Sequence, residues 1–343
     1  MASEKKTTRI VIAEDEAIIR LDLRETLEEE GYEVVADTGR GDTAIELVRQ
    51  HQPDVAIFDV KMPGLDGLDA ARVVSAEKVV SDYRSGFTAS QMVALGEAGE
   101  ISRRIAQRAL SNEVITPGVT TLEDVAWWMM DQLQQRALGS SFDMPSVYIT
   151  GPKGIEATST DRIIQRGDLL IIDWGVGYLN VWTDVKRMAY VLKPGETAVP
   201  KGIQTAFDNA LKVRDVIRRT IRPGPTAGDM VEQLKTEITK SGFRMQGTFN
   251  EVTNDGQVEV MFGCHSVGDR GHGAGPSIAT FNPRQMTFAI KPYNPFSIEL
   301  FAWTPNPDWG GAKVRIPLED DAIVTERGVE WLYPVNERVW LIK

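Results

Sequence analysis

Residues 8–73 alternate short apolar runs with amphipathic segments. Three of the runs predict buried β-strands, and their sequences are RIVIAED, YEVVAD and PDVAIFDV. Between them, apolar side chains recur at helical spacing from Ile18 to Leu27, and a second helix is predicted over residues 42–50. This order of strands and helices with short turns is typical of a parallel, doubly wound α/β sheet. The pattern then stops, and no fourth and fifth strands of the same layout follow.

The chain from about residue 75 onward has a different pattern. A long helical stretch covers about 88–112, and two later segments repeat one another, TPGVTTLEDVAWWMMDQL at 116–133 and RPGPTAGDMVEQLKTEI at 222–238. In each, a Pro-Gly-x-Thr turn leads into an amphipathic helix that a threonine can cap. The repeat indicates an α+β domain with two related halves. Coincidence is the alternative, because Pro-Gly-x-Thr turns commonly start helices.

Two strand-like runs flank the turn GVGYLN within residues 167–192 and predict a β-hairpin. In a hairpin centred between Tyr178 and Leu179, Asp173 and Asp184 lie opposite one another. Like charges directly opposite each other destabilise a sheet, and a buried carboxylate without a partner is costly. A cation between the two acids would remove both penalties, so the pattern favours a metal site.

The acids in this part of the chain also have ordinary explanations. A shifted hairpin would bring either aspartate to solvent or to the basic residues Lys186 and Arg187. Glu299 lies in the run FSIELFAW, which could be an edge strand with a wet face. Glu319 opens the acidic triplet EDD after the run VRIPL, and a solvated turn would explain the two aspartates of that triplet.

Composition limits the chemistry of the chain. The 343 residues carry a formal charge of −11, which argues against nucleic-acid binding because phosphate contacts need a basic face. No apolar run approaches the roughly 20 residues of a membrane span. The lone Cys264 excludes an internal disulfide framework and fits a reducing cytoplasm. Two of the three histidines, His265 and His272, lie beside it in CHSVGDRGHGAGP, so any metal site here would rely mainly on carboxylates.

Four acids in apolar strands and a histidine are the ligand set of a two-metal hydrolytic site. On these residues, the chain from about 75 to its end resembles the pita-bread superfamily of methionine aminopeptidases, Xaa-Pro aminopeptidases, prolidases and creatinase. The matching motifs are Asp173-Trp-Gly175 with Asp184 eleven residues on, His265 with Gly268 at +3 and His272 at +7, Ile298-Glu299, and Glu319-Asp320 ahead of Val324-Thr325.

This resemblance implies a dinuclear metallopeptidase that acts on peptides, closest to Xaa-Pro aminopeptidases and dipeptidases. It implies that two divalent ions of manganese, cobalt or zinc are held by Asp173 on one side, by His265 and Glu299 on the other, and by Asp184 and Glu319 as bridging ligands. A hydroxide shared by the ions would attack the scissile carbonyl. Dimers are usual in the family, so we expect a homodimer.

The resemblance also assigns catalytic roles and shows two departures. Glu299 would shuttle the proton, and His272 would steady the carbonyl or the tetrahedral intermediate. If His272 were the ligand instead, no histidine would follow at +7, so His265 is favoured as the ligand. Family peptidases usually carry another histidine shortly before the first aspartate, where this chain has SVYITGPKGIEATSTD, and Leu300 replaces a proline. Both departures bear on turnover and substrate choice.

Residues 8–73 resemble the first half of a response-regulator receiver domain, close to the RNA-antiterminator branch. Glu14 and Asp15 match the acidic pair that holds Mg²⁺, and Asp59, before VKMPG, matches the phosphoacceptor. The threonine or serine of the fourth strand and the lysine of the fifth have no counterpart, so phosphorylation would have little to switch.

We therefore expect a receiver-like domain over residues 1–73 and a pita-bread domain over residues 74–343, joined near residues 71–76. Two alternatives to a peptidase stay open. The first is a phospho-signalling or peptide-binding protein whose pita-bread domain is inactive. The second is an engineered chimera of a receiver and a peptidase.

Overall fold

The chain divides into two compact units, Met1–Ala76 and Glu77–Lys343. The computed structural model describes residues 7–67, 77–159, 161–247, 252–253 and 255–343. The expected join near residues 71–76 lies outside the described residues. Each unit is therefore treated by itself.

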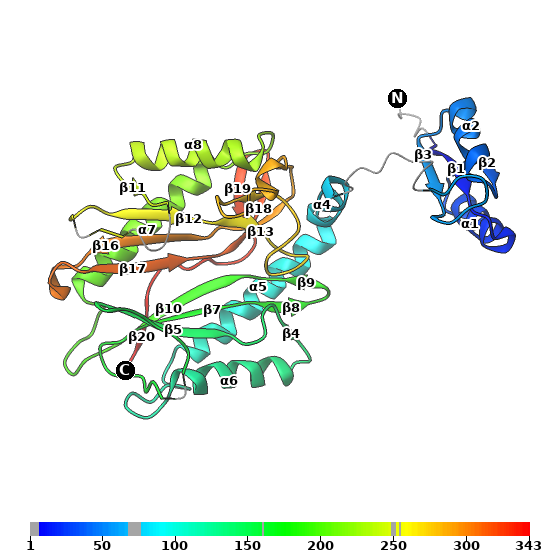
Figure 1. The fold of residues 1–343 in the computed structure, drawn as a ribbon. Coiled ribbons are helices and arrows are strands. Elements are labelled where there is room, and N and C mark those ends of the chain that lie inside the picture. Colours follow the sequence, from blue (N-terminus) through cyan, green and yellow to red (C-terminus); the bar gives the residue numbers. More distant parts are fainter. Residues whose placement is uncertain (1–6, 68–76, 160, 248–251, 254) are drawn as a thin grey trace. The chain divides into compact units, whose positions relative to one another are not determined.

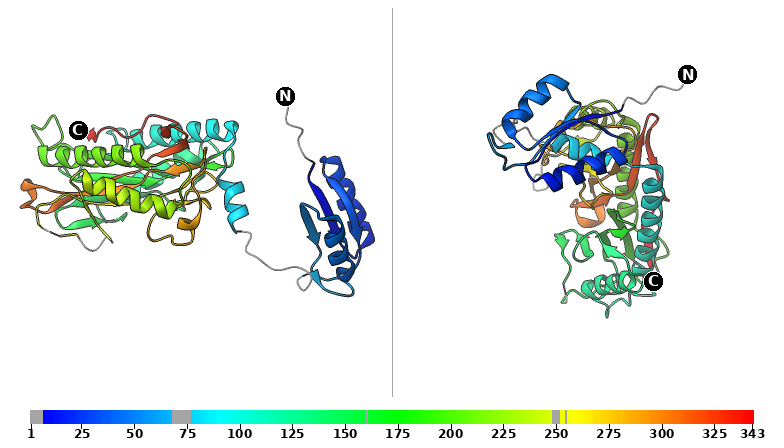
Figure 2. Two further views of the ribbon diagram at one scale, coloured as in Figure 1. Left: turned by 90° about the horizontal axis from the view of Figure 1, so that it is seen from above. Right: turned by 90° about the vertical axis from the view of Figure 1, so that its right-hand side faces the viewer.

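Over its described residues, 7–67, the first unit is a three-stranded parallel sheet with two helices, as the alternating pattern predicted. Its elements are β1 (Arg9–Ala13), α1 (Ala17–Glu29), β2 (Glu33–Thr38), α2 (Gly41–His51) and β3 (Val55–Phe58). The strand order is β2-β1-β3, and both neighbours run parallel to β1. The helices α1 and α2 lie on opposite faces of this sheet (Figure 2). Ile10 and Ile12 of β1 are buried against Leu23 and Leu27 of α1.

The second unit is built from five helices and several mostly antiparallel sheets in the part of the chain that the structure describes. The helices are α4 (Glu77–Ser85), α5 (Ala89–Ala109), α6 (Leu122–Gln134), α7 (Lys201–Thr220) and α8 (Ala227–Lys240). One sheet, in the order β20-β10-β7-β5-β6, contains β5 (Ser146–Gly151), β6 (Gly154–Glu156), β7 (Leu169–Trp174), β10 (Val185–Val191) and β20 (Trp340–Ile342).

Two further sheets form the other half of the unit. The order β11-β12-β16-β17 joins β11 (Arg244–Met245), β12 (Glu259–Phe262), β16 (Leu300–Pro305) and β17 (Lys313–Leu318). The order β14-β13-β15-β18-β19 joins β14 (Ser277–Ile278), β13 (Cys264–Ser266), β15 (Pro295–Ser297), β18 (Asp321–Thr325) and β19 (Gly328–Trp331). A small sheet holds β4 (Gly139–Ser140), β8 (Val176–Tyr178) and β9 (Val181–Trp182). The helices α6 and α8 lie on opposite outer sides of the strands (Figure 1).

The repeated Pro-Gly-x-Thr segments form equivalent structures in the two halves. Thr121 and Thr226 each accept a hydrogen bond from the backbone N–H of the aspartate three residues on, which completes a capping box at the start of α6 and of α8. Each threonine also forms an isolated antiparallel bridge, to Ile163 and to Ala289 respectively. The prediction of two related halves is confirmed.

The hairpin that carries Asp173 has a different register from the one predicted. Leu179 and Asn180 have φ of 48° and 60° and form a two-residue turn, so the hairpin is centred one residue later. A turn with positive φ at both central residues matches the strand twist, and asparagine tolerates it well. Lys186 of β10 is consequently the residue opposite Asp173. The prediction that Asp184 lies there is wrong.

Three neighbouring strands break at one level. β12 gives way to β13 at Gly263, β15 to β16 at Ile298-Glu299, and β17 to β18 at Glu319-Asp320. The antiparallel ribbon leaves one sheet and enters the next there, since Ser297 pairs with Asp321 on one side of the break and Leu300 with Leu318 on the other. The two glutamates lie at this crossover, where their side chains can point between the sheets.

Candidate functional site

Five side chains that the sequence resemblance implied as ligands converge between the two halves of the second unit. Asp173 lies near the end of β7, Asp184 directly precedes β10, His265 lies in β13, and Glu299 and Glu319 lie at the strand breaks. Ligand atoms of Asp173, Asp184 and Glu319 all lie within 4.8 Å of one another, and the same holds for His265, Glu299 and Glu319. The fold therefore brings together residues from four separate parts of the chain.

The two histidines approach this cluster from one side. His265 Nε2 lies 3.3 Å from Glu319 Oε1 and 3.7 Å from Asp184 Oδ2. Its Nδ1 lies 3.1 Å from the carbonyl oxygen of Ser266, and an N–H at Nδ1 would donate there and leave Nε2 free as a metal ligand. His272 Nε2 lies 3.2 Å from Asp184 Oδ2, while its side chain is 72% exposed.

The ammonium group of Lys186 lies among the carboxylates of this cluster. Its Nζ lies 2.7 Å from Glu299 Oε1 and 3.1 Å from Asp173 Oδ2, and it also donates to Glu319 Oε2. The lysine side chain is only 6% exposed. The sequence suggested Lys186 only as a partner in a shifted hairpin. The signal for its place in the site was its position two residues after Asp184 in a strand, which puts both side chains on one face.

The acids of the cluster differ in their affinity for protons. Burial raises the pKa of Asp184 well above its usual range, and the neighbouring carboxylates of Glu319 and Asp173 raise it further. Burial also raises the pKa of Asp173 and Glu299, although Lys186 opposes the shift. For Glu319, Lys186 and His265 outweigh burial and hold the pKa below its usual value.

The negative charge of the cluster also changes the pKa of His265. Burial lowers the pKa of His265, but the carboxylates of Glu319 and Asp184 outweigh it and raise the pKa to about 9. Asp184 Oδ1 and His265 Nε2 are both buried without a hydrogen-bond partner among the described residues. Unpaired oxygen and nitrogen donors in an acidic, buried cluster fit a divalent cation.

Two aspartates next to Glu319 are buried, so the expectation of a solvated turn is wrong for them. Asp320 pairs at 2.6 Å with Arg187, and both side chains are fully buried. Asp321 accepts the backbone N–H of Asp184 and the hydroxyl of Tyr333. Alternation in β10 directs Arg187 away from the metal-type cluster, where Asp320 compensates its charge. The sequence pattern did not predict these pairs behind the cluster, because the partners of Asp320 and Asp321 come from distant segments.

A cavity of about 380 Å³ opens onto the cluster. Besides the ligand-type residues it is lined by Phe142, Phe281, Asn282 and Gln285. A second cavity of about 290 Å³ reaches Lys186 from another direction. These cavities give a small molecule access to the cluster.

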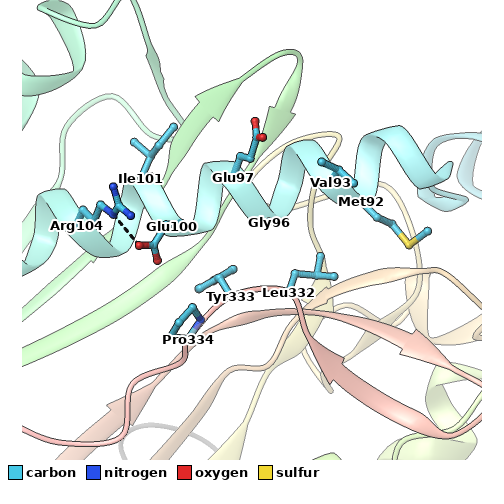
Figure 3. Close-up of a pocket in the computed structure, with 10 residues that line it drawn as sticks. All are labelled: Met92, Val93, Gly96, Glu97, Glu100, Ile101, Arg104, Leu332, Tyr333 and Pro334. Carbon is cyan, nitrogen blue, oxygen red and sulfur yellow. Dashed lines mark hydrogen bonds and ion pairs between the residues drawn. The ribbon is translucent and has the colours of Figure 1, made fainter.

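A larger cavity, of about 760 Å³, contains none of the five ligand-type residues in its lining. It runs along α5 and is bordered on its other side by Leu332, Tyr333 and Pro334, which face the helix (Figure 3). Its lining is mostly apolar, apart from the ion pair of Glu100 and Arg104 and the carboxylate of Glu97. It shares Tyr333 with the layer behind the cluster.

The receiver-type residues also converge in the first unit. Carboxylate oxygens of Glu14, Asp15 and Asp59 all lie within 4.8 Å of one another. They follow β1 and β3, whose carboxyl ends meet at one edge of the parallel sheet. In a different part of the chain, Cys264 is fully buried in the apolar core, as packing alone would require. No helix in the described ranges is long and apolar enough to cross a membrane.

Two family models match the chain. The model of metallopeptidase family M24 matches residues 94–326, and that of the response regulator receiver domain matches residues 10–115. The two matches overlap over residues 94–115, which the structure assigns to α5 and the turn after it in the second unit.

Two curated relatives each match about a fifth of the chain. The transcriptional regulatory protein PdtaR of Mycobacterium tuberculosis is 54% identical over 71 residues, which are 21% of this chain and 35% of that protein. The chemotaxis protein CheY of Bacillus subtilis is 36% identical over 66 residues, 19% of this chain and 55% of that protein. The chain thus spans well under two thirds of the length of these relatives.

Solved structures share the fold of the chain. The X-Pro aminopeptidase from Thermotoga maritima has a TM-score of 0.60 at 16% identity and covers 98% of this chain and 88% of its own. The prolidase from Pyrococcus horikoshii has a TM-score of 0.58 at 16% identity and covers 96% and 85%. The prolidase from Pyrococcus furiosus has a TM-score of 0.57 at 18% identity and covers 92% and 86%.

Proposed function

Since this chain belongs to metallopeptidase family M24, we propose that it is a cytoplasmic exopeptidase of the Xaa-Pro aminopeptidase or dipeptidase type. The observation that carries the proposal is the convergence of four carboxylates and one imidazole on a single buried point beside a cavity. Such a donor set suits Mn²⁺, Co²⁺ or Zn²⁺. A peptide is the substrate that the family implies.

Asp173, Asp184, His265, Glu299 and Glu319 are the residues that would hold metal. A divalent ion bound there would polarise a carbonyl group and lower the pKa of water. The resemblance implies two such ions, and four carboxylates could balance their charge. Lys186, however, already contributes one positive charge to the same oxygens.

Side chains of the protein would carry out proton transfer, stabilise the carbonyl oxygen and exclude water. Glu299 lies beside the cavity, and burial raises its pKa, so its carboxylate can take a proton from the attacking water and pass it to the leaving amine. His272 reaches the same cavity from the loop that follows β13. Its side chain is largely exposed and can donate to the oxygen of the scissile carbonyl. Phe142 and Phe281 would exclude water from the bound peptide.

The preference for Xaa-Pro peptides is the finer part of the proposal. It rests on the sequence resemblance and on the shared fold with an X-Pro aminopeptidase and with prolidases. The chain has only three histidines, and the third, His51, belongs to the first unit. The imidazole that family peptidases usually place before the first aspartate therefore has no equivalent in the second unit, so substrate contacts there must differ. A homodimer stays a prediction.

A cleavage assay tests the function. The full chain is stripped of metal, reloaded with Mn²⁺, Co²⁺ or Zn²⁺, and incubated with a library of Xaa-Pro and other short peptides. We expect release of the N-terminal residue, and loss of that release in Glu299→Gln at unchanged thermal stability. Metal-loaded protein that binds peptides but cleaves none of them would instead support a peptide-binding domain.

The first unit suggests a second activity, phosphorylation at Asp59. The three converging carboxylates could hold Mg²⁺, which receiver domains use for this chemistry. Labelling with acetyl phosphate in Mg²⁺ should give a phosphorylated protein, and Asp59→Asn should abolish the label. No label in the wild-type chain would leave this unit as a structural segment.

A further inference from the structure

The hairpin register places a lysine inside the carboxylate cluster. Lys186 lies opposite Asp173 across the β7–β10 ladder and two residues after Asp184, so it shares their face of the sheet. The next residue, Arg187, points to the other face and pairs with Asp320. The ammonium therefore reaches the cluster because of the backbone arrangement and not through a chance side-chain rotation.

The ammonium uses the oxygens that one of two metal ions would need. It contacts Asp173 Oδ2, Glu299 Oε1 and Glu319 Oε2, and its three N–H donors match these three acceptors. A lysine nitrogen offers no lone pair to a metal while it is charged, and it repels a divalent ion placed among the same oxygens. Part of the cluster is thus already neutralised by the chain itself.

The donors that Lys186 leaves free lie on the other side of the cluster. They are His265 Nε2, Asp184 Oδ2 and the second oxygen of Glu319, Oε1; the His265 nitrogen lies 3.7 Å from the first oxygen and 3.3 Å from the second. Glu319 Oε1 also accepts the hydroxyl of Ser297 at 2.6 Å, and Asp184 Oδ2 lies 3.2 Å from His272 Nε2, so an ion would share these oxygens with those neighbours. Ligands of a tetrahedral ion at about 2.0–2.2 Å lie roughly 3.3–3.6 Å apart, so these separations suit one ion. Three protein ligands with one open position are typical of a catalytic site.

The balance of charge in the cluster also favours one metal ion over two. The four carboxylates carry four negative charges when ionised, and two divalent ions alone would balance them. Lys186 would then be a fifth positive charge that only a further anion, such as a bound hydroxide, could balance. One divalent ion and Lys186 leave the cluster with a slight excess of negative charge. A buried cluster tolerates a small imbalance far better when its charges are paired and hydrogen-bonded.

We infer that the ammonium of Lys186 takes the place of the second metal ion, so that the chain binds one divalent ion through Asp184, His265 and Glu319. This inference rests on the proposed metal-dependent function and narrows it. Asp173 and Glu299 are then held by the lysine, and Glu319 spans the ammonium and the ion, one oxygen to each. Glu299 keeps a free role in proton transfer, because it is not committed to a metal.

Metal counting tests the inference without any assay of activity. The full chain is stripped with a chelator, loaded with Mn²⁺ or Zn²⁺, desalted and analysed for metal per chain by mass spectrometry. We expect one ion in the wild type and two in Lys186→Ser, which removes the ammonium and opens space. Lys153→Ser, at an exposed lysine, serves as the matched control and should bind one.

Each outcome decides between the two proposals. Two ions in the wild type would overturn the inference and leave the peptidase proposal standing. No ion in either the wild type or Lys186→Ser would overturn both. An ion only in Lys186→Ser would show that the lysine excludes metal altogether, which also contradicts the inference.

A second comparison does not depend on the folding of the lysine variant. In the wild-type background, Glu299→Gln should still bind one ion, whereas His265→Ala should bind none. Loss of metal in Glu299→Gln would place an ion on the side that we assign to Lys186 and would refute the inference. Electron paramagnetic resonance of the Mn²⁺-loaded wild type should show an isolated ion without coupling to a second.

Discussion

The backbone N–H of Asp184 points at the carboxylate of Asp321, with its nitrogen 3.2 Å and 3.3 Å from the two oxygens. The same carboxylate accepts the hydroxyl of Tyr333, and the Tyr333 oxygen accepts the N–H of Asp321. All three residues are buried. Asp321 therefore positions a metal-type ligand without reaching the cavity itself.

Replacing Asp321 with asparagine should weaken metal binding. The carboxylate of Asp321 now accepts from two donors, the N–H of Asp184 and the hydroxyl of Tyr333. An asparagine amide would turn an N–H donor towards one of them, so Asp184 would shift. Losses of about 10–100-fold in metal affinity are typical when such a supporting partner is changed. A titration with Zn²⁺ against a competing chelator measures the change. Tyr333→Phe is the matched control, since it removes one hydroxyl and should cost about 1–3 kcal/mol of stability with a smaller loss of affinity.

The buried pair of Arg187 and Asp320 predicts a large stability effect. Arg187→Met would leave Asp320 with Arg214, 3.4 Å away, as its remaining side-chain cation among the described residues. Removing one partner of a buried ion pair costs about 3–5 kcal/mol. Urea denaturation measures this loss. The double variant Arg187→Met, Asp320→Leu should lose less than the single one, and an equal or larger loss would show that the charge of Asp320 is not the cause.

Gly263 should be needed for the position of Glu299. A Cβ at this position would lie 2.9 Å from Glu299 Oε2 and 3.1 Å from the ring of Phe281, so alanine would displace the carboxylate. A shift of about 1 Å in a catalytic group can reduce the rate about 100-fold. We expect Gly263→Ala to lower kcat by this order with little change in melting temperature. Gly151→Ala, where a Cβ meets nothing within 4 Å, should leave kcat unchanged.

The ion pairs of Glu100 predict a pH effect outside the cluster. Hydrogen bonds from Arg103 and Arg104, opposed by burial, lower the pKa of Glu100 to about 2. Because the folded pKa lies below the unfolded one, the stabilisation is complete above about pH 4.5 and is lost as the pH falls towards 2. Glu100→Gln should cost about 0.2–1 kcal/mol at pH 7, since the pair is partly exposed. Melting curves of the two proteins should converge between pH 4.5 and 2, and a constant difference would contradict the assignment.

Local patterns determined much of this protein. Apolar periodicity and Pro-Gly-x-Thr turns located the strands of the first unit and the helices α6 and α8, because these features depend on neighbours within one turn or one strand. The family resemblance carried by the spacings of Asp173, Asp184 and His265 likewise implied a metal-type site before any contact was known.

Tertiary structure decided which groups meet at that site. A two-residue turn at Leu179 and Asn180 set the register that puts Lys186, and not Asp184, opposite Asp173. The breaks at Glu299 and Glu319 and the burial of Asp321 depend on strands from distant segments passing from one sheet to another. One sequence pattern is compatible with several registers and crossovers, and only packing across the two halves selects among them. The number of positive charges in the cluster follows from that selection.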